Sequence, residues 1–285
     1  MYKTEILKRL NKADYTRLPR LLDIEDTFDD ITSTEDLKKI LQIADINGSK
    51  YMEIYKLKED VDILNIIQVL SPMHYHPNLP YIEGQGALTI TKVYVHQSDF
   101  EILADFYTFD EVWVKSEDGR NQTLTPLHQR RVLHIKYNHN RQKIILTIDP
   151  IGDGVKISED VQRYIPEIFN QYNISFFEYF ELMTIDNAVY TMIDNEILRP
   201  TRLKSTDEGS NRVYDTLAQN PNDSLTDETT FTDTRQNALN INRMRLKHDE
   251  LNISVELFSD DLLKVWSRAN MEQNDGLKEN IIQLL

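Results

Sequence analysis

The sequence predicts an α+β fold in which an N-terminal helical unit is followed by a mainly antiparallel sheet with flanking helices. Three observations lead to this prediction. Apolar residues recur at helical spacing before residue 80, β-branched and aromatic residues gather in short segments from residue 87 onward, and two of these segments flank a short turn as the strands of a hairpin do. With 40% hydrophobic residues, 14 Tyr and 10 Phe among 285 residues, the chain can fill a large core.

Residues 1–80 are predicted to form the mostly helical N-terminal unit. An apolar stripe at i, i+3, i+4 and i+7 predicts a buried helix face: Leu37, Ile40, Leu41 and Ala44. The sequence TSTE at 32–35 places a hydroxyl three residues ahead of a carboxylate, which is typical of a helix start. A strand over 51–57 and a helix over 61–70 follow, and three prolines in 71–80 end the unit.

Residues 81–204 are predicted to form an α+β core with a basic hairpin. The turn Asn138-His139-Asn140-Arg141 separates the two arms of that hairpin. Pro166 is expected to kink or interrupt the helix that contains it. The expected strands are 88–95, 111–115, 131–137 and 143–149. A helix is expected over 158–172 and a pair of core helices over 176–192.

Residues 205–235 differ in composition from the rest of the chain. They hold seven acidic residues and two Arg among many Ser, Thr and Asn, so they are predicted to form an acidic mobile loop or linker. Residues 236–285 are predicted to add a β-meander and a C-terminal helix that complete the core. The expected strands are 240–247, 251–258 and 262–266, and the expected helix is 277–285.

Composition narrows the class of protein. The chain has no Cys, which excludes disulfides, thiolate metal sites and cysteine nucleophiles. Its N-terminus has no signal-peptide pattern, and no apolar run reaches the ~18–20 residues of a membrane helix. A cytoplasmic protein without membrane contact is therefore expected. Its formal net charge of −15 repels nucleic acid at long range, so binding to nucleic acid would need a local basic patch.

Sequence motifs for the common catalytic architectures are missing. The chain has no Walker A sequence, no G-x-G-x-x-G, no H-E-x-x-H and no G-x-S-x-G. Only eight glycines are present, which does not favour a loop that cradles phosphates. No cofactor is expected, and the sequence favours a protein without catalysis.

Two small groups of residues are candidates for a metal site. His74 and His76 would share one face of a strand, with Glu83 as a third ligand, but the prolines beside them favour an irregular loop. Asp149 and Asp153 follow a predicted strand, where carboxylates hold divalent cations, although turn chemistry explains both equally well. These four residues carry the alternative prediction of a metal-dependent hydrolase, such as a nuclease.

One stretch of the chain, residues 119–148, contains no acidic residue. It has a formal charge of +6 and three of the seven histidines. In its second half the side chains alternate, with Leu133, Ile135 and Tyr137 on one face of the strand and His134 and Lys136 on the other. The predicted strand 240–247 repeats this pattern, since its cations alternate with Met244 and Leu246. The predicted anion- or partner-binding residues are Arg130, Arg131, Lys136, Arg141, Lys143, Arg243, Arg245 and Lys247.

If both strands join one sheet, their polar faces would merge into one cationic surface. This hypothesis extends the surface to Arg199, Arg202 and Lys204. Three interpretations remain open: the cations pair with acids from elsewhere in the chain, they bind an acidic partner or the chain's own acidic loop, or they bind nucleic acid.

The expected function is a non-catalytic binding or adaptor subunit of a larger intracellular assembly. It would use the cationic sheet surface to contact a polyanion or an acidic protein. The alternatives are the metal-dependent hydrolase and a protein that binds nucleic acid directly.

Overall fold

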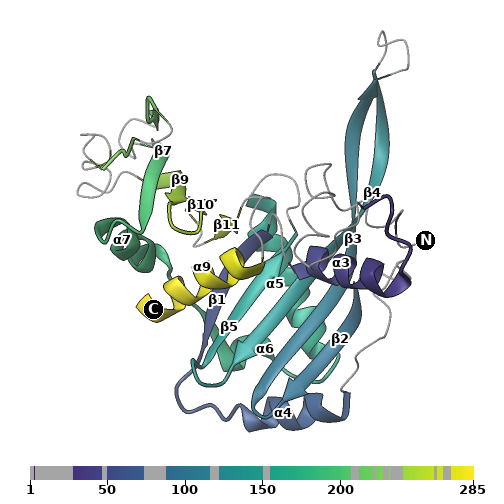
Figure 1. Ribbon diagram of the computed structural model, residues 1–285. Helices are drawn as coiled ribbons and strands as arrows, with labels where there is room; N and C mark the ends of the chain where they lie inside the picture. The colour runs from purple at the N-terminus through teal and green to yellow at the C-terminus, as the bar shows by residue number, and fades with distance from the viewer. Residues whose placement is uncertain are drawn as a thin grey trace. The chain divides into compact units, whose positions relative to one another are not determined.

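The computed structural model describes residues 3, 28–46, 50–73, 88–115, 122–149, 155–206, 212–220, 223–226, 231, 240–259, 262–265 and 271–285. It confirms the α+β class, with helices on antiparallel strands (Figure 1). The chain forms two compact units. The first unit comprises Met1–Arg9, Ile31–Ile46 and Leu57–Glu181, and the second comprises Leu10–Asp30, Asn47–Lys56 and Leu182–Leu285. The predicted boundaries at residues 80 and 235 fall outside the described residues, and the predicted division into domains stays a prediction.

The sheet of the first unit is a row of antiparallel strands in chain order: β2 (Leu88–His96), β3 (Asp99–Lys115), β4 (Gln122–Asn138) and β5 (Lys143–Ile148). The predicted hairpin is confirmed, because Tyr137 of β4 lies opposite Ile144 of β5. β3 and β4 have 17 residues each. The strand predicted over 111–115 is therefore only the end of β3, whose earlier part places Phe100, Ile102 and Phe106 on one face and Glu101 and Asp105 on the other.

One face of this sheet is buried by aromatic packing. Phe100 and Phe106 of β3 are at most 1% exposed. Phe106 stacks on Tyr164 and Phe100 meets Phe169 edge to face, with ring centroids 4.4 and 6.3 Å apart. Both partners belong to α5 (Val155–Asn170), which continues through its proline. This helix starts earlier than predicted.

The first unit also contains short elements before and after these strands. The predicted N-terminal helices are described in part, as α3 (Thr34–Ile46), α4 (Leu64–Leu70) and the 3₁₀ helix η1 (Ser71–Met73). At the start of α3 the Ser33 hydroxyl accepts a hydrogen bond from the Asp36 N–H at 3.3 Å, in keeping with the predicted helix start. The predicted helix pair over 176–192 is interrupted, because α6 (Phe176–Tyr179) is followed by the short strand β6 (Phe180–Leu182) and then by α7 (Asp186–Asp194) of the second unit.

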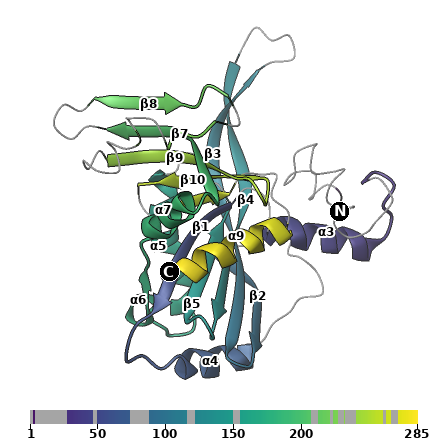
Figure 2. The same cartoon turned by 60° about the vertical axis from the view of Figure 1, so that its left-hand side comes forward.

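The strands of the second unit come from distant parts of the chain. Their order is β1 (Lys50–Leu57), β11 (Leu263–Val265), β10 (Ile253–Phe258), β9 (Asn240–His248), β7 (Leu198–Thr206) and β8 (Val213–Leu217). Figure 2 shows β8, β7, β9 and β10 side by side. The predicted meander is confirmed as β9, β10 and β11. Strand β8 lies within the segment for which we predicted a mobile loop.

Helices cover one face of the second unit's sheet. Met244, Leu246 and Val255 are fully buried on that face. α9 (Met271–Leu284) lies over it, since the Gln273 side chain donates to the Leu251 carbonyl and Asn280 contacts His248. The cationic side chains of β9 alternate with these buried residues and therefore lie on the opposite face.

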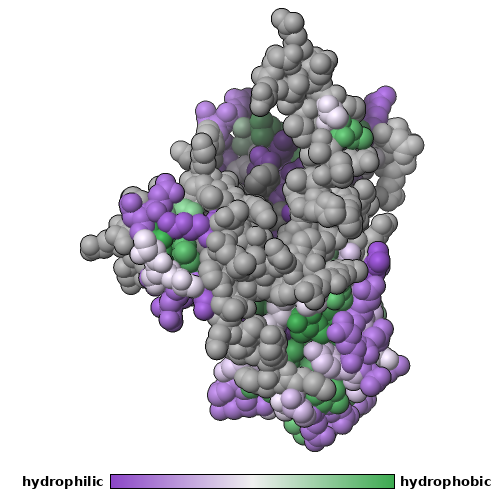
Figure 3. Space-filling view, turned by 90° about the vertical axis from the view of Figure 1, so that its right-hand side faces the viewer, coloured by the Kyte–Doolittle hydropathy of each residue, from purple (hydrophilic) through white to green (hydrophobic). Residues whose placement is uncertain are grey.

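On the side of the molecule drawn in Figure 3, hydrophilic areas of the described residues lie beside smaller apolar areas. Within the described ranges, no helix combines the length and apolar character needed to cross a membrane.

Candidate functional site

The candidate site is the face of the second unit's sheet that lies opposite to the face contacted by α9, and we call it the cationic face. It is defined by Arg199, Arg202 and Lys204 of β7, Arg243, Arg245 and Lys247 of β9, and Lys264 of β11. The strand register places them together, because Arg202 lies opposite Arg245 and Lys204 lies opposite Arg243. Residues that are directly opposite in neighbouring strands point to the same side of the sheet. The structure thus brings the two predicted groups of cations, from 199–204 and 243–247, onto one face.

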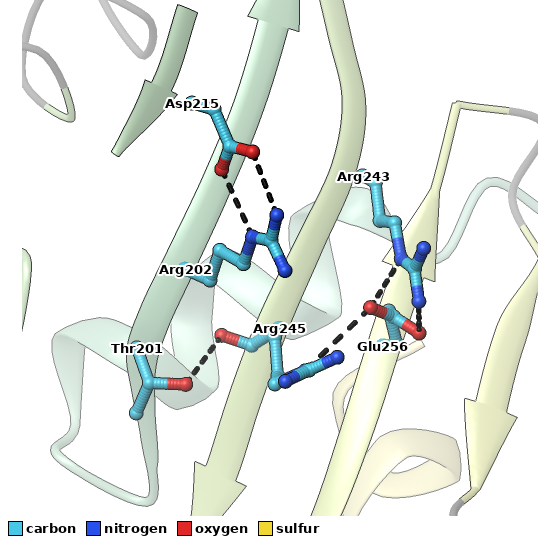
Figure 4. A network of polar contacts seen from close by, with 6 residues as sticks. All are labelled: Thr201, Arg202, Asp215, Arg243, Arg245 and Glu256. Carbon is cyan, nitrogen blue, oxygen red and sulfur yellow. Dashed lines mark hydrogen bonds and ion pairs between the residues drawn. The ribbon is translucent and has the colours of Figure 1, made fainter. Parts of the chain in front are cut away.

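Glu256 of β10 lies in the middle of the cationic face and is 1% exposed. The Arg243 guanidinium donates two hydrogen bonds to this carboxylate, from Nε to Oε1 and from Nη2 to Oε2 at 2.6 Å (Figure 4). Arg245 adds a longer ion pair, with its Nε 3.7 Å from Oε1. A buried carboxylate of this kind is tolerated only with its cations in place, so these two arginines have a structural task besides any binding role.

Asp215 of the edge strand β8 is the second carboxylate. Arg202 donates to both of its oxygens, at 2.9 and 2.6 Å (Figure 4). The hydrogen bonds from Arg202 lower the pKa of Asp215 despite the opposing effect of burial, and the charges of Lys204 and Arg243 lower it further. Lys204 is exposed and lies directly opposite Asp215 in the register. These cations therefore favour the ionised form of Asp215.

At the other end of the face, Arg199 makes the third bidentate pair. Its guanidinium donates to the two oxygens of Asp249 at 2.9 and 2.8 Å and to the Asp223 carbonyl at 2.9 Å. Lys247 donates to the Asn252 side-chain oxygen at 2.6 Å. These contacts fix the directions of the side chains.

The pairing leaves the face positive. The seven cations of the face outnumber the three carboxylates that they contact, Asp215, Asp249 and Glu256, although the net charge of the protein is −15. Aromatic rings support two of the cations. The Lys264 ammonium lies 5.1 Å from the centroid of Tyr51, and the Arg243 guanidinium lies 5.5 Å from that of Phe258.

The remaining predicted site residues, Arg130, Arg131, Lys136, Arg141 and Lys143, belong to the first unit. They do not all share one face. Arg131 lies opposite Phe106 on the side of the buried aromatic residues, whereas Lys136 is exposed on the other side. The side chain of Arg130 lies outside the described part of the chain. The predicted merging of this hairpin with the cationic face joins residues of different units and stays a prediction.

The face that carries Lys136 is balanced in charge. Glu101 is placed between two cations, with the Lys92 ammonium at 2.5 Å and His134 Nε2 at 2.8 Å. Burial raises the pKa of Glu101, but the hydrogen bonds and charges of His134 and Lys92 outweigh it and lower the pKa to about 2. Asp99 and Asp105 occupy the same side of β3. This surface consequently has no excess of positive charge like that of the cationic face.

The metal-site candidates do not come together as a described site. His74, His76 and Asp153 lie outside the described residues. Asp149 accepts a hydrogen bond from the Val132 N–H at 2.8 Å, so its carboxylate ties the end of β5 to β4. The described ranges contain no group of three or more His, Asp or Glu that could hold a metal ion.

No protein-family model, no curated protein and no solved structure matches this chain. The assignment of the site therefore rests on geometry and charge.

Sequence reasoning missed the carboxylates of the face and Lys264. A signal for Glu256 was present, because it alternates with Ile253, Val255 and Leu257 as the sole acid of its strand. Pairing the predicted strands 240–247 and 251–258 as a hairpin would have set Glu256 beside the arginines. Pairing the predicted strands 251–258 and 262–266 in the same way would have brought Lys264 to this carboxylate.

Proposed function

We propose that this protein is a non-catalytic binding or adaptor subunit of a larger cytoplasmic assembly, and that the cationic face holds an acidic or polyanionic partner. One observation carries the proposal. Arg202 faces Arg245, and Lys204 faces Arg243, across neighbouring strands. Like charges directly opposite each other destabilise a sheet by several tenths of a kcal/mol, on the order of 0.2–1 per pair. A ligand with negative charge would turn this cost into binding energy.

The pairs within the face also prepare it for binding. A guanidinium has five N–H donors, and Arg202 and Arg243 each use two of them on Asp215 and Glu256. Each of these guanidinium groups therefore has three N–H donors besides the two that hold its carboxylate. Because the carboxylates hold these side chains in one orientation, less conformational entropy is lost when a partner binds.

The test is a titration with two polyanions, polyglutamate and a 20-base-pair DNA duplex, over a range of NaCl concentrations. A charge-reversing substitution of Arg243 or Arg245 would leave the buried Glu256 carboxylate without its cation and could unfold the protein. The binding variant is therefore Lys204→Glu with Lys247→Glu. The matched control reverses two cations of the first unit, Lys136→Glu with Arg141→Glu.

We expect the wild-type protein to bind polyanion with an affinity that falls as salt rises. The binding variant should lose at least about tenfold in affinity and about two units of salt slope, one for each cation, whereas the control should bind as the wild type does. An unchanged salt slope in the binding variant, or a loss of binding in the control alone, would remove the cationic face as the site.

A further inference from the structure

Strand β8 forms the end of the second unit's sheet, and it is unusually apolar for an exposed edge. Among the described strands, none pairs with the side of β8 that faces away from β7. Its large apolar side chains are open to solvent, with Val213 56%, Tyr214 39% and Leu217 65% exposed. Three exposed apolar residues within five positions point to a surface that another chain covers.

The hydrogen bonds between β7 and β8 show which backbone groups of β8 are open. The Ala218 N–H donates to the Thr201 carbonyl at 3.0 Å, and these two residues are opposite each other in the register. Hydrogen-bonded and non-hydrogen-bonded pairs alternate along an antiparallel ladder. The backbone groups of Tyr214 and Thr216 therefore point to β7, and those of Val213, Asp215 and Leu217 point to the open edge.

Within its described residues, 213–217, the edge lacks several features by which proteins prevent strand addition. Such features are proline, lysine, an inward-pointing charge or a bulge. Residues 213–217 contain neither Pro nor Lys, and their pairing with β7 has no shift in register. The one charged residue, Asp215, is held by Arg202. The strand is consequently a suitable template for a further strand.

We infer that the open edge of β8 binds an extended, acidic segment of a partner protein as an additional strand of this sheet. The backbone of the partner would pair with Val213, Asp215 and Leu217. Its side chains on one side would extend over the cationic face, where Arg202 and Lys204 are the nearest cations. This inference rests on the proposed function and names the form of the partner.

Two other occupants fit less well. Nucleic acid has no row of backbone amides to pair with a strand edge, and apolar side chains at the edge contribute nothing to a phosphate contact. A second copy of this chain would pair β8 with β8 and bring two cationic faces side by side, so that their positive charges would repel each other. A polypeptide that carries carboxylates avoids both problems.

The test uses the full-length protein and a labelled ten-residue peptide that alternates Glu with Val. A second peptide has Lys in place of each Glu. In the protein, Val213→Pro removes an N–H that is directed to the open edge and not to β7. Val213 is the first residue of β8, a position where proline is tolerated in strands. Val213→Thr is the matched control, because it keeps the N–H and the preference for strand conformation.

We expect the acidic peptide to bind the wild-type protein and Val213→Thr alike at low salt. Val213→Pro should weaken this binding at least about tenfold, and the lysine peptide should not bind. Hydrogen exchange of the wild-type protein gives a second readout that needs no variant. On binding, the amides of 213, 215 and 217 should become protected, while those of 214 and 216 should not change.

Four results would overturn the inference. If Val213→Pro binds the peptide as the wild type does and no amide of β8 becomes protected, the partner does not add to this edge. In that case the proposed function still stands, provided that Lys204→Glu with Lys247→Glu abolishes binding of polyglutamate. Three other results would contradict an acidic polypeptide as the occupant. The lysine peptide could bind as well as the acidic one, duplex DNA could be the only ligand that binds, or the protein could form a dimer that Val213→Pro dissociates.

Discussion

At the scale of residues, two carboxylates each lie between cations that belong to neighbouring strands. Glu256 forms ion pairs with Arg243 and Arg245 of β9. Glu101 forms hydrogen bonds with His134 of β4 and Lys92 of β2. A carboxylate that is withdrawn from water is stable only when such partners replace its hydration. Substitution of either carboxylate would therefore leave its cationic partners without this ion pair.

For Glu101 we predict a stability that depends on acid pH. Its folded-state pKa of about 2 lies below the ordinary value of 4.5. A lowered pKa means that the carboxylate stabilises the protein above the unfolded-state value, and that this contribution, at most on the order of 3 kcal/mol, is lost as pH falls from 4.5 toward 2. Urea unfolding at a series of pH values should show a steeper loss of stability in the wild type than in Glu101→Gln.

The control for this prediction is Glu167→Gln. Glu167 pairs with Arg163 on an exposed part of α5, with their side chains 43% and 64% exposed. Because exposed pairs contribute little, its pH profile should match that of the wild type. Parallel profiles for Glu101→Gln and the wild type would show that Glu101 does not make the predicted contribution.

At the scale of elements, α9 illustrates what local sequence does not reveal. The helix was predicted over 277–285, but it begins at Met271. Gly276 and the polar residues before it weaken the helical pattern in the sequence. The structure supplies the reason for the glycine, because a Cβ at this position would lie 3.2 Å from Leu251 Cδ2 in the turn between β9 and β10. Tertiary contact, and not helix propensity, determines this residue.

We predict that Gly276→Leu destabilises the protein although leucine favours helices more than glycine by roughly 1 kcal/mol. The added side chain would collide with Leu251, and overpacking of this kind typically costs about 1–3 kcal/mol. Adding Leu251→Ala should restore part of the stability, which a double-mutant cycle by urea unfolding measures. Gln283→Leu, on the exposed side of α9, should change the free energy of unfolding by less than about 0.5 kcal/mol. An additive cycle would refute the contact.

The strands show the same division between local and distant information. β2, β5, β9 and β10 were predicted within one or two residues of their observed ends or starts, because their side chains alternate at a period of two. β8 was not predicted, since its five residues lie among Ser, Asn and Asp and gain their conformation from pairing with β7. Cationic residues on β9 could be placed on one face from sequence, and pairing the predicted hairpin would have added Glu256, but Asp215 could not be placed because β8 was not predicted.

At the scale of the whole molecule, a net charge of −15 coexists with a face whose seven cations outnumber the carboxylates that they contact. The fold class follows from local periodicity and was predictable. The composition of the two units was not, because the second unit joins β1 near residue 50 to strands beyond residue 182. No local pattern in the sequence encodes a pairing at that distance.

The charge distribution predicts opposite effects of salt on folding and on binding. Screening reduces the repulsion among the excess carboxylates, so the Tm should rise between about 0.02 and 0.5 M NaCl, whereas binding of polyglutamate should weaken over the same range. Sucrose at equal osmolality serves as the non-ionic control for Tm. A Tm that falls as NaCl is added would mean that attractive ion pairs outweigh the net repulsion.

The pairing of β1 with β11 also has a consequence for biosynthesis. Met52 lies opposite Leu263, so the ribosome must add roughly 210 residues after β1 before its partner exists, which takes about 10–40 s at ordinary rates of translation. During that interval the side of β1 that β11 later occupies has no native neighbour. Nascent chains stalled before residue 263 should therefore recruit holding chaperones, and release of the complete polypeptide should end that association.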